Sequence, residues 1–302
     1  MKITNVNYSN DSSGASIAVK RINQMFLKNG FDSQILSFLN SKSKNKFEIT
    51  LRNFAHKILQ KIQQNIFDIR IPHSTNFGFI SSNFYKKINT KNSEIVNLHW
   101  IGNEMMSIKD ISKIKGFLIW TLHDMWPYCA IENYTDQKYF ELNYSFKKKK
   151  LNFFLDFFFS SKIKYFNKIK IVICTSNWQK KMADKSLIFK SAKKILIPLP
   201  LDFNLWSPSK KSSIRKKMNI PQNKKVISFI LSHRYAAKRK GLDYVIRYLE
   251  NSKRNDLVLL TINCENLNIK SNKVQHINIK STDNIQERIN FYSVSDIFLM
   301  PS

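Results

Sequence analysis

The sequence predicts an α/β protein with two doubly wound parallel sheets, the second of them incomplete. Strand and helix patterns alternate from the N-terminus onward, which is typical of a parallel sheet with crossover helices. A proline-containing link at 197–208 interrupts this alternation, and a second alternation of strands and helices follows it. Hydrophobic residues make up 43% of 302 residues, which is enough to fill two cores.

The first predicted domain spans 1–205. Short apolar runs predict strands at these ranges: 2–7, 34–38, 94–98, 117–122 and 169–174. Apolar residues at helical spacing predict a helix over 15–29 that ends at Gly30, where a left-handed residue is favoured. A short helix is expected over 108–114, and another from Trp178 onward, after Ser176.

The second predicted domain spans 206–302. Strands are expected at three ranges, 226–231, 257–262 and 274–279, and helices at 242–250 and 285–293. The last residues, 295–302, predict a buried strand that leads into a loop. A parallel strand needs a crossover helix to cover it, and the second alternation is roughly half the usual length of such a domain. The second domain is therefore expected to be truncated.

Composition limits the function classes. Three cysteines without metal-ligand spacing encode neither a disulfide framework nor a zinc site, and no secretion signal is visible at the N-terminus. The longest apolar stretch, 151–159, contains Asp156 and is too short to span a bilayer. We expect a cytoplasmic protein, with peripheral contact to the inner face of the cytoplasmic membrane left open.

The net charge of +29 would attract nucleic acid, anionic lipid or acidic substrates. Abundant Lys, Asn, Ile and Phe with few Gly are also typical of an AT-rich coding sequence, which accounts for part of the charge. A basic nucleic-acid-binding protein is the alternative from a different class. We disfavour it, and expect no nucleic-acid partner, because the lysines are dispersed and no binding module is visible.

The loop 232–241 joins an apolar strand to a helix and carries Arg234 and Lys240. Ligands of open α/β sheets bind at the carboxyl ends of strands, where helix N-termini also face anions. A guanidinium and an ammonium on this loop could hold a diphosphate from two sides. A solvated basic loop is the alternative interpretation.

His123 and Gly14 are two further candidates. The strand 117–122 delivers His123 to the carboxyl edge of the first sheet, where a general acid/base would face substrate. A histidine satisfied by local backbone is the simpler interpretation, and His99, placed similarly, is expected to be structural. Gly14, in the loop 11–15, could let backbone approach a ligand, although a plain turn explains it equally well.

The segment 146–170 mixes phenylalanines with lysines, a composition suited to an anionic membrane surface. The favoured alternative is a helix whose aromatic side chains pack against the first domain.

Six motifs in this order resemble glycosyltransferase family 4, in particular the bacterial branch that builds colanic-acid-like surface polysaccharides. They lie at 13–15, 121–126, 174–178, 197–202, Arg234 with 240–241, and 295–302. The resemblance spans nearly the whole chain and implies a two-domain GT-B enzyme with Rossmann-like domains, in which the first domain binds the acceptor and the second binds a nucleotide-sugar.

The resemblance also implies roles. Such enzymes transfer a hexose with retention of configuration to a polysaccharide or lipid-linked oligosaccharide, and they need no metal or other cofactor. By position, Arg234 and Lys240 would hold the donor diphosphate, and His123 would be the catalytic-site residue beside the transferred sugar. Gly14 would line the cleft near the phosphates.

The chain departs from the family pattern at several places. The first loop has one glycine where relatives often have two, and Leu199 and Pro200 stand where relatives commonly carry Asn and Gly. Only Cys129 remains where many relatives have several cysteines. The two glutamates, eight positions apart, that follow the final motif in relatives are absent. An inactive remnant of such an enzyme is therefore the leading alternative.

Overall fold

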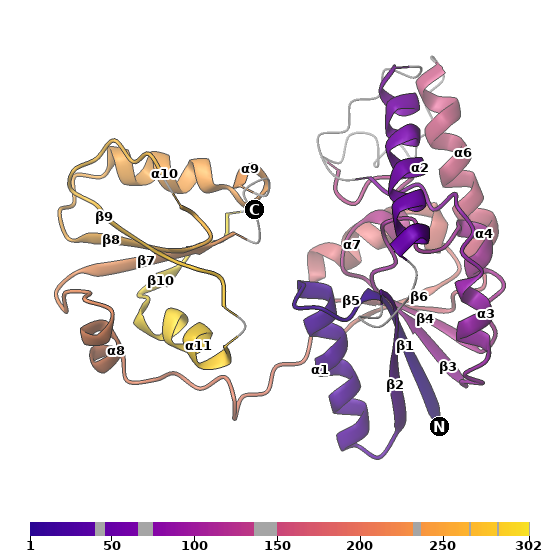
Figure 1. Ribbon diagram of the computed structural model, residues 1–302, viewed down its shortest axis with the longest axis horizontal. Coiled ribbons are helices and arrows are strands. Elements are labelled where there is room, and N and C mark those ends of the chain that lie inside the picture. The colour runs from indigo at the N-terminus through magenta and orange to yellow at the C-terminus, as the bar shows by residue number, and fades with distance from the viewer. Residues whose placement is uncertain are drawn as a thin grey trace. The chain divides into compact units, whose positions relative to one another are not determined.

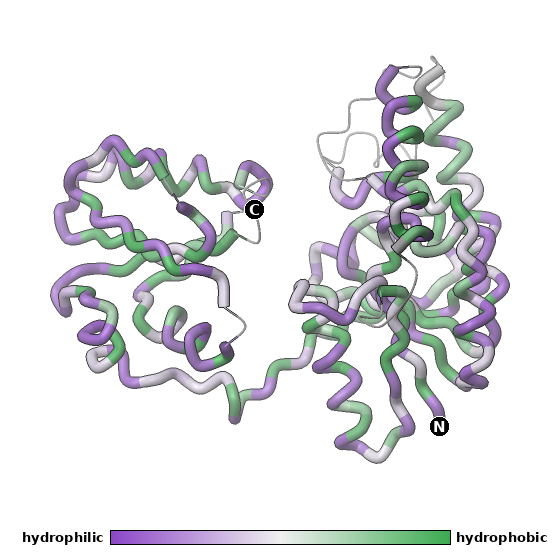
Figure 2. The backbone as a smooth tube through the Cα atoms, viewed as in Figure 1, coloured by the Kyte–Doolittle hydropathy of each residue, from purple (hydrophilic) through white to green (hydrophobic). Residues whose placement is uncertain are grey.

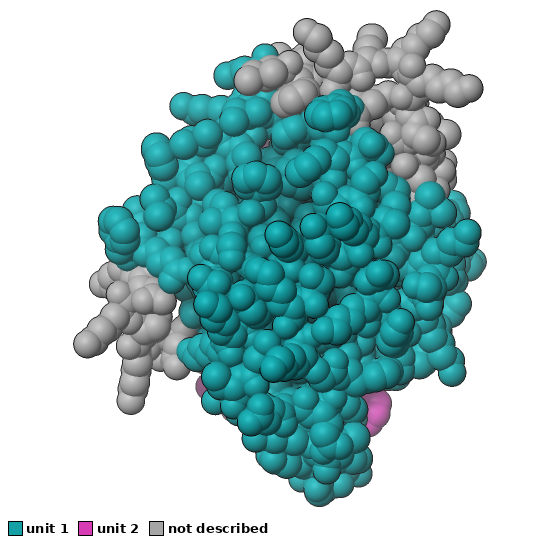
Figure 3. Space-filling view, turned by 90° about the vertical axis from the view of Figure 1, so that its right-hand side faces the viewer, with its two compact units in different colours: residues 1–200 teal, residues 201–302 magenta. Residues whose placement is uncertain are grey.

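The computed structural model describes residues 1–39, 46–65, 75–135, 150–231, 237–265, 267–282 and 284–301. The chain divides into two compact units, unit 1 (Met1–Pro200) and unit 2 (Leu201–Ser302), and Figure 3 shows one face of unit 1 in teal. Each unit contains one parallel sheet, so the predicted fold class, with two doubly wound sheets, is confirmed.

The sheet of unit 1 has the strand order β2-β1-β3-β4-β5-β6, and all of its pairings are parallel. Its strands are β1 (Lys2–Ser9), β2 (Asp32–Leu39), β3 (Ile95–Leu98), β4 (Phe117–Thr121), β5 (Ile171–Cys174) and β6 (Lys193–Leu196). The five predicted strands are all present. The sixth, β6, was not predicted because two of its four residues are lysines, which suit an edge strand but weaken the apolar signal.

Helices lie on both sides of this sheet. They are α1 (Gly14–Lys28), α2 (Lys46–Asn65), α3 (Phe84–Asn89), α4 (Ile108–Ile111), α6 (Lys150–Phe166) and α7 (Asn177–Lys185). Figure 1 shows α1 on one side of the strands and α3 and α4 on the other. The helices α3, α4 and α6 contribute to one large apolar core around Trp120 and Phe166.

Local sequence explains the predicted helix ends. Gly30 has a φ of +78° after α1, as expected for a residue that terminates a helix in the left-handed region. Ser176 caps α7 by accepting a hydrogen bond from the backbone N–H of Gln179. The helix α4 is shorter than predicted and ends at Ile111.

Unit 2 contains a four-stranded parallel sheet in the order β10-β7-β8-β9. Its strands are β7 (Lys225–Ile230), β8 (Leu257–Ile262), β9 (Gln275–Ile279) and β10 (Ile297–Phe298), and its helices are α8 (Lys211–Lys217), α9 (Ala237–Lys240), α10 (Leu242–Asn251) and α11 (Ile285–Val294). One apolar cluster contains α10 residues and the other contains α8 and α11 residues, so both faces of the sheet are covered.

The prediction of a buried final strand was wrong. Ile297 is 54% exposed and Phe298 is 39% exposed. The strand β10 lies at the edge of the sheet and pairs only with β7, so each of its faces is covered less completely than those of a central strand.

The helix α6 divides the aromatic residues of the basic segment 146–170 between two environments. Phe158, Phe159 and Phe166 are buried in the core, whereas Phe153 and Phe157 are exposed. In the part of the chain that the structure describes, no helix is both long and apolar enough to span a membrane.

Candidate functional site

The carboxyl ends of β3 and β4 bring two histidines together. His99 follows β3 and His123 follows β4, and these strands are neighbours in the sheet. The Nδ1 atom of His99 lies 3.0 Å from the Nε2 atom of His123. His99 is buried, and His123 is partly exposed. His123 therefore reaches the edge of the sheet where parallel α/β proteins bind ligands.

A chain of polar side chains determines which histidine nitrogen carries the proton. Asn5 donates its amide N–H groups to Asn23 and Ser33, so its Oδ1 is the acceptor that lies 3.2 Å from Nε2 of His99. A neutral His99 then donates from Nε2 and accepts at Nδ1 from the Nε2–H of His123. His123 is left with an unprotonated Nδ1, for which the described residues provide no partner.

Both histidines are neutral at pH 7. Burial lowers the pKa of His123 to about 4. Burial, and then the neighbouring His123, lowers the pKa of His99 well below its ordinary value. The site thus presents a neutral imidazole that accepts a hydrogen bond rather than an imidazolium that donates one.

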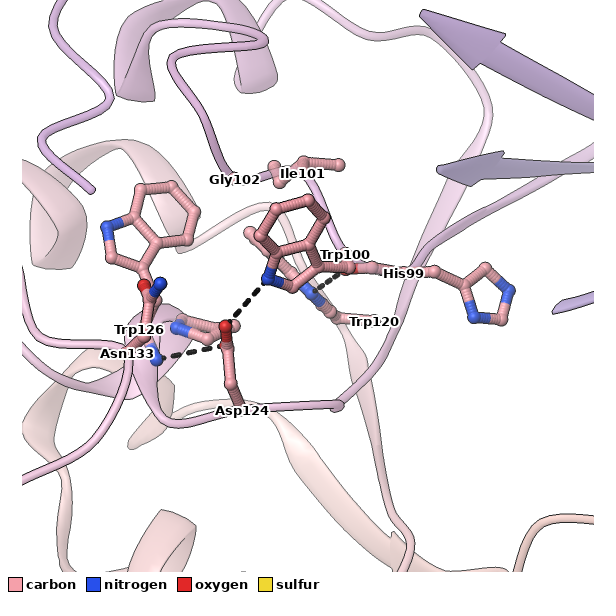
Figure 4. A pocket seen from close by; sticks show the side chains of 9 residues that line it. His99, Trp100, Ile101, Gly102, Trp120, Asp124, Trp126 and Asn133 are labelled. Atoms are coloured by element: carbon pink, nitrogen blue, oxygen red, sulfur yellow. Dashed lines mark hydrogen bonds between the residues drawn. The ribbon is translucent and has the colours of Figure 1, made fainter. Parts of the chain in front are cut away.

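Asp124, the next residue, forms its hydrogen bonds inside the protein. It accepts hydrogen bonds from the indole N–H of Trp100, at 2.8 Å, and from the backbone N–H of Trp126. Burial raises the pKa of Asp124 to about 6. Figure 4 shows Asp124 pointing toward Trp100, while the His99 ring points away from this group. The hollow around Asp124, whose lining includes Trp100, Trp120 and Trp126, has no room for a molecule the size of water. We therefore assign Asp124 a structural role.

Gly14 occupies open space at the start of α1. A Cβ atom placed on it would meet no heavy atom within 4 Å, so a ligand could approach this backbone. Asp11 lies in the preceding loop and accepts from the backbone N–H of Ser13 at 2.9 Å. Although burial opposes the shift, hydrogen bonds from Ser13, Ser16 and Ser9 lower the pKa of Asp11 to about 2. A phosphate at Gly14 would therefore have an ionised carboxylate nearby.

Lys240 of unit 2 follows the carboxyl end of β7 and immediately precedes Gly241 and α10. Its side chain is partly buried, and burial followed by the adjacent Arg239 lowers its pKa. Among the described residues, Lys240 has no hydrogen-bond or ion-pair partner. A partly desolvated ammonium without a carboxylate can bind an anion at small additional desolvation cost.

Gly241 fixes the backbone at this point. Its φ is +75°, and a Cβ atom there would overlap the carbonyl oxygen of Pro301. Only glycine therefore allows the segment after β10 to pass this close to the start of α10. The other predicted cation, Arg234, lies outside the described residues.

Sequence reasoning did not connect His99 with His123. The signal was present, because Asn5, Asn97 and Thr121 lie in three neighbouring strands and alternate with apolar residues. Asn97 donates to Asn5 and accepts from the Thr121 hydroxyl at 3.0 Å. Side chains two apart in a strand share one face, so such residues predict a polar layer beneath the histidines.

No protein-family profile and no curated protein sequence matches the chain. Solved structures do match. A glycosyltransferase from Rickettsia africae ESF-5 superposes with a TM-score of 0.56 and 16% identity over 98% of this chain and 72% of that one. Anabaena Alr3699/HepE in complex with UDP-glucose superposes with a TM-score of 0.54 and 14% identity, over 99% of this chain and 73% of that one. WaaG, a glycosyltransferase involved in lipopolysaccharide biosynthesis, superposes with a TM-score of 0.53 and 11% identity, over 99% of this chain and 75% of that one. These similarities identify the fold as that of GT-B glycosyltransferases.

Proposed function

We propose that this chain is a glycosyltransferase that takes a sugar from a nucleotide-sugar donor. Lys240 is the observation that carries the proposal, since it is a partly buried cation without an anionic partner in the described residues at the strand edge where this fold binds ligands. The Anabaena protein of the same fold is complexed with UDP-glucose, which supports a nucleotide-sugar as the ligand class.

The two domains would bind different substrates. In this proposal, residues 206–302 bind the donor, with Lys240 and Arg234 at its diphosphate, and residues 1–205 bind the acceptor. The cations would stabilise negative charge that develops on the leaving nucleotide. Gly14 would contact the donor phosphates through its backbone, and the ionised Asp11 would weaken that contact.

His123 would contact the transferred sugar. Its unprotonated Nδ1 can accept a hydrogen bond from a sugar hydroxyl, and the pair with His99 fixes the ring orientation that this requires. Because the ring is neutral at pH 7, it adds no positive charge beside a developing oxocarbenium ion.

The finer features follow from the family 4 resemblance of the motifs. We propose retention of configuration, a hexose as the transferred sugar, no metal requirement, and membership of the branch that includes colanic acid glycosyltransferases. A polysaccharide or lipid-linked oligosaccharide would be the acceptor. WaaG, of the same fold, is involved in lipopolysaccharide biosynthesis, which supports an acceptor of this kind.

Calorimetric titration with UDP and with GDP tests the donor site. The Lys240→Ala variant should bind the preferred nucleotide about tenfold or more weakly, because a charge-assisted hydrogen bond to phosphate is lost. Lys238→Ala is the matched control, since Lys238 is an exposed lysine of the same short helix. Equal affinities in both variants, or no binding of either nucleotide to the unmodified chain, would refute the proposal.

A further inference from the structure

The helix α2 carries four large apolar side chains on the side that faces solvent. Its exposed side chains Phe47, Leu51, Phe54 and Ile58, which we call the α2 stripe, are 81%, 55%, 60% and 42% exposed. Their spacing of four, three and four residues places them in one line along the helix. Green hydrophobic stretches recur along α2 in Figure 2. Most surface helices have the opposite arrangement, with the apolar side packed on the core.

Polar contacts fix α2 in this orientation. The Arg52 guanidinium, 5% exposed, donates to the backbone oxygens of Glu104 at 2.7 Å and Ser81 at 2.9 Å, and to the Glu48 carboxylate. One turn further on, His56 lies 3.2 Å from the buried Glu104 carboxylate. Rotating the stripe inward would break these contacts and leave Glu104 without the His56 partner, so the apolar side stays exposed.

A second helix exposes aromatic side chains nearby. The rings of His56, from α2, and Phe154, from α6, both pack on Phe77, with ring centroids 5.3 Å and 6.1 Å away. Figure 1 shows α2 and α6 extending together to one end of unit 1. Phe153 of α6 is 76% exposed, so α6 also exposes an aromatic side chain.

The charges beside the stripe select its occupant. Lys57 and Lys61 are exposed and lie together on one border of the α2 stripe. The only carboxylate of α2, Glu48, pairs with Arg52. A second copy of the chain would bring these lysines, and a net charge of +29 on each copy, against one another. An anionic bilayer surface accommodates both the exposed phenylalanines and the lysines.

We infer that the α2 stripe, together with Lys57 and Lys61, docks on the surface of an anionic lipid bilayer. The inference does not depend on transferase activity. The helix would lie in the interface plane, with its phenylalanines at the boundary between headgroups and acyl chains and its lysines at the headgroups.

Co-sedimentation with phosphatidylcholine vesicles, with and without phosphatidylglycerol, tests the inference on the full chain. Phe47→Ser with Phe54→Ser should lower the partition coefficient about tenfold or more, because two exposed aromatic anchors are lost. Phe203→Ser is the matched control, since Phe203 is 79% exposed in unit 2. Lys57→Gln with Lys61→Gln should lower the partition coefficient about fivefold per lysine, and only on anionic vesicles. Lys216 and Lys217 are an exposed pair on α8, and Lys216→Gln with Lys217→Gln should change the partition coefficient little.

A site-specific label provides a second measurement. All three cysteines are buried, so a thiol-reactive, polarity-sensitive dye would label Leu51→Cys selectively. Its emission should shift to the blue on anionic vesicles, and that of a dye on Phe203→Cys should not. Equal vesicle binding by stripe and control variants would overturn the inference. So would a dimer in light scattering that Phe54→Ser dissociates, because the stripe would then bind a second copy.

Discussion

The imidazoles of His99 and His123 share one hydrogen bond, 3.0 Å long, across the carboxyl ends of β3 and β4. The amide oxygen of Asn5 fixes the proton on the far side of His99, so the protonation of His123 is set by a residue of a third strand. This relationship makes the protonation state of His123 testable without any substrate.

Nitrogen NMR should find His123 as the Nε2–H tautomer, neutral at pH 7 and titrating near pH 4. Its pKa in the unfolded chain is about 6.5, so the unfolded state takes up this proton first. The free energy of unfolding should therefore fall as the pH drops from about 6.5 to about 4, by roughly 2–3 kcal/mol from this residue. Urea titrations across this range should show a shallower fall for His123→Gln, and an unchanged slope would contradict the assignment.

Replacing Asn5 should affect His99 in two distinguishable ways. Asn5→Leu leaves the Nε2–H of His99 without its acceptor and should cost about 1–3 kcal/mol of unfolding free energy in denaturant titrations. Asn5→Asp keeps an acceptor and adds negative charge, so the pKa of His99 should rise above that in the unmodified chain. If NMR found the same His99 pKa in Asn5→Asp and in the unmodified chain, Asn5 would not be the partner of His99.

Gly241→Ala should destabilise unit 2 by more than backbone strain alone. Gly241 and Gly30 have nearly equal positive φ values, +75° and +78°, but only Gly241 is crowded, by Pro301. Gly30→Ala should therefore cost about 1 kcal/mol, the strain of a side chain in the left-handed region. Differential scanning calorimetry should show a larger loss of unfolding free energy for Gly241→Ala than for Gly30→Ala. Equal losses would mean that the backbone at Pro301 moves aside without cost.

Lys162 should make the stability of the chain rise with pH above neutrality. Its side chain is fully buried, donates to the backbone oxygens of Trp126 and Cys129, and lies 3.9 Å from the Trp126 ring centroid. Burial lowers its pKa to about 7, so between about pH 7 and pH 10.5 the unfolded state binds more protons. The difference in unfolding free energy between Lys162→Met and the unmodified chain should change across this range. A constant difference would show that Lys162 stays charged when folded.

The sequence indicated most of the sheet but not all of its surroundings. The strand 257–262 was predicted at its observed limits because this fully buried run is apolar except for Thr261. The helix α2 was not predicted, and its apolar line, Phe47 to Ile58, would have suggested the wrong buried side. The buried side is set by Arg52 reaching Glu104, 52 positions away, and local periodicity carries no information about such a contact.

The candidate site was predictable one residue at a time. His123, Gly14 and Lys240 were identified because each follows a strand of a parallel sheet. The alternation of polar with apolar residues in these strands indicates a polar layer. The pairing of His123 with His99 also depends on the register that places Asn5 opposite Asn97, and no spacing along the chain reveals that register. Arg234 lies outside the described residues, and its place at the diphosphate stays a prediction.

The polar layer beneath the histidines also bears on how unit 1 folds. Asn5 opposite Asn97, with Thr121 beside them, forms hydrogen bonds that exist for only one alignment of three strands. A slip by one residue would turn the Asn5 amide toward the large apolar core and leave it unsatisfied there. These side chains thus discriminate against misaligned intermediates during assembly, a specificity that an entirely aliphatic layer would lack.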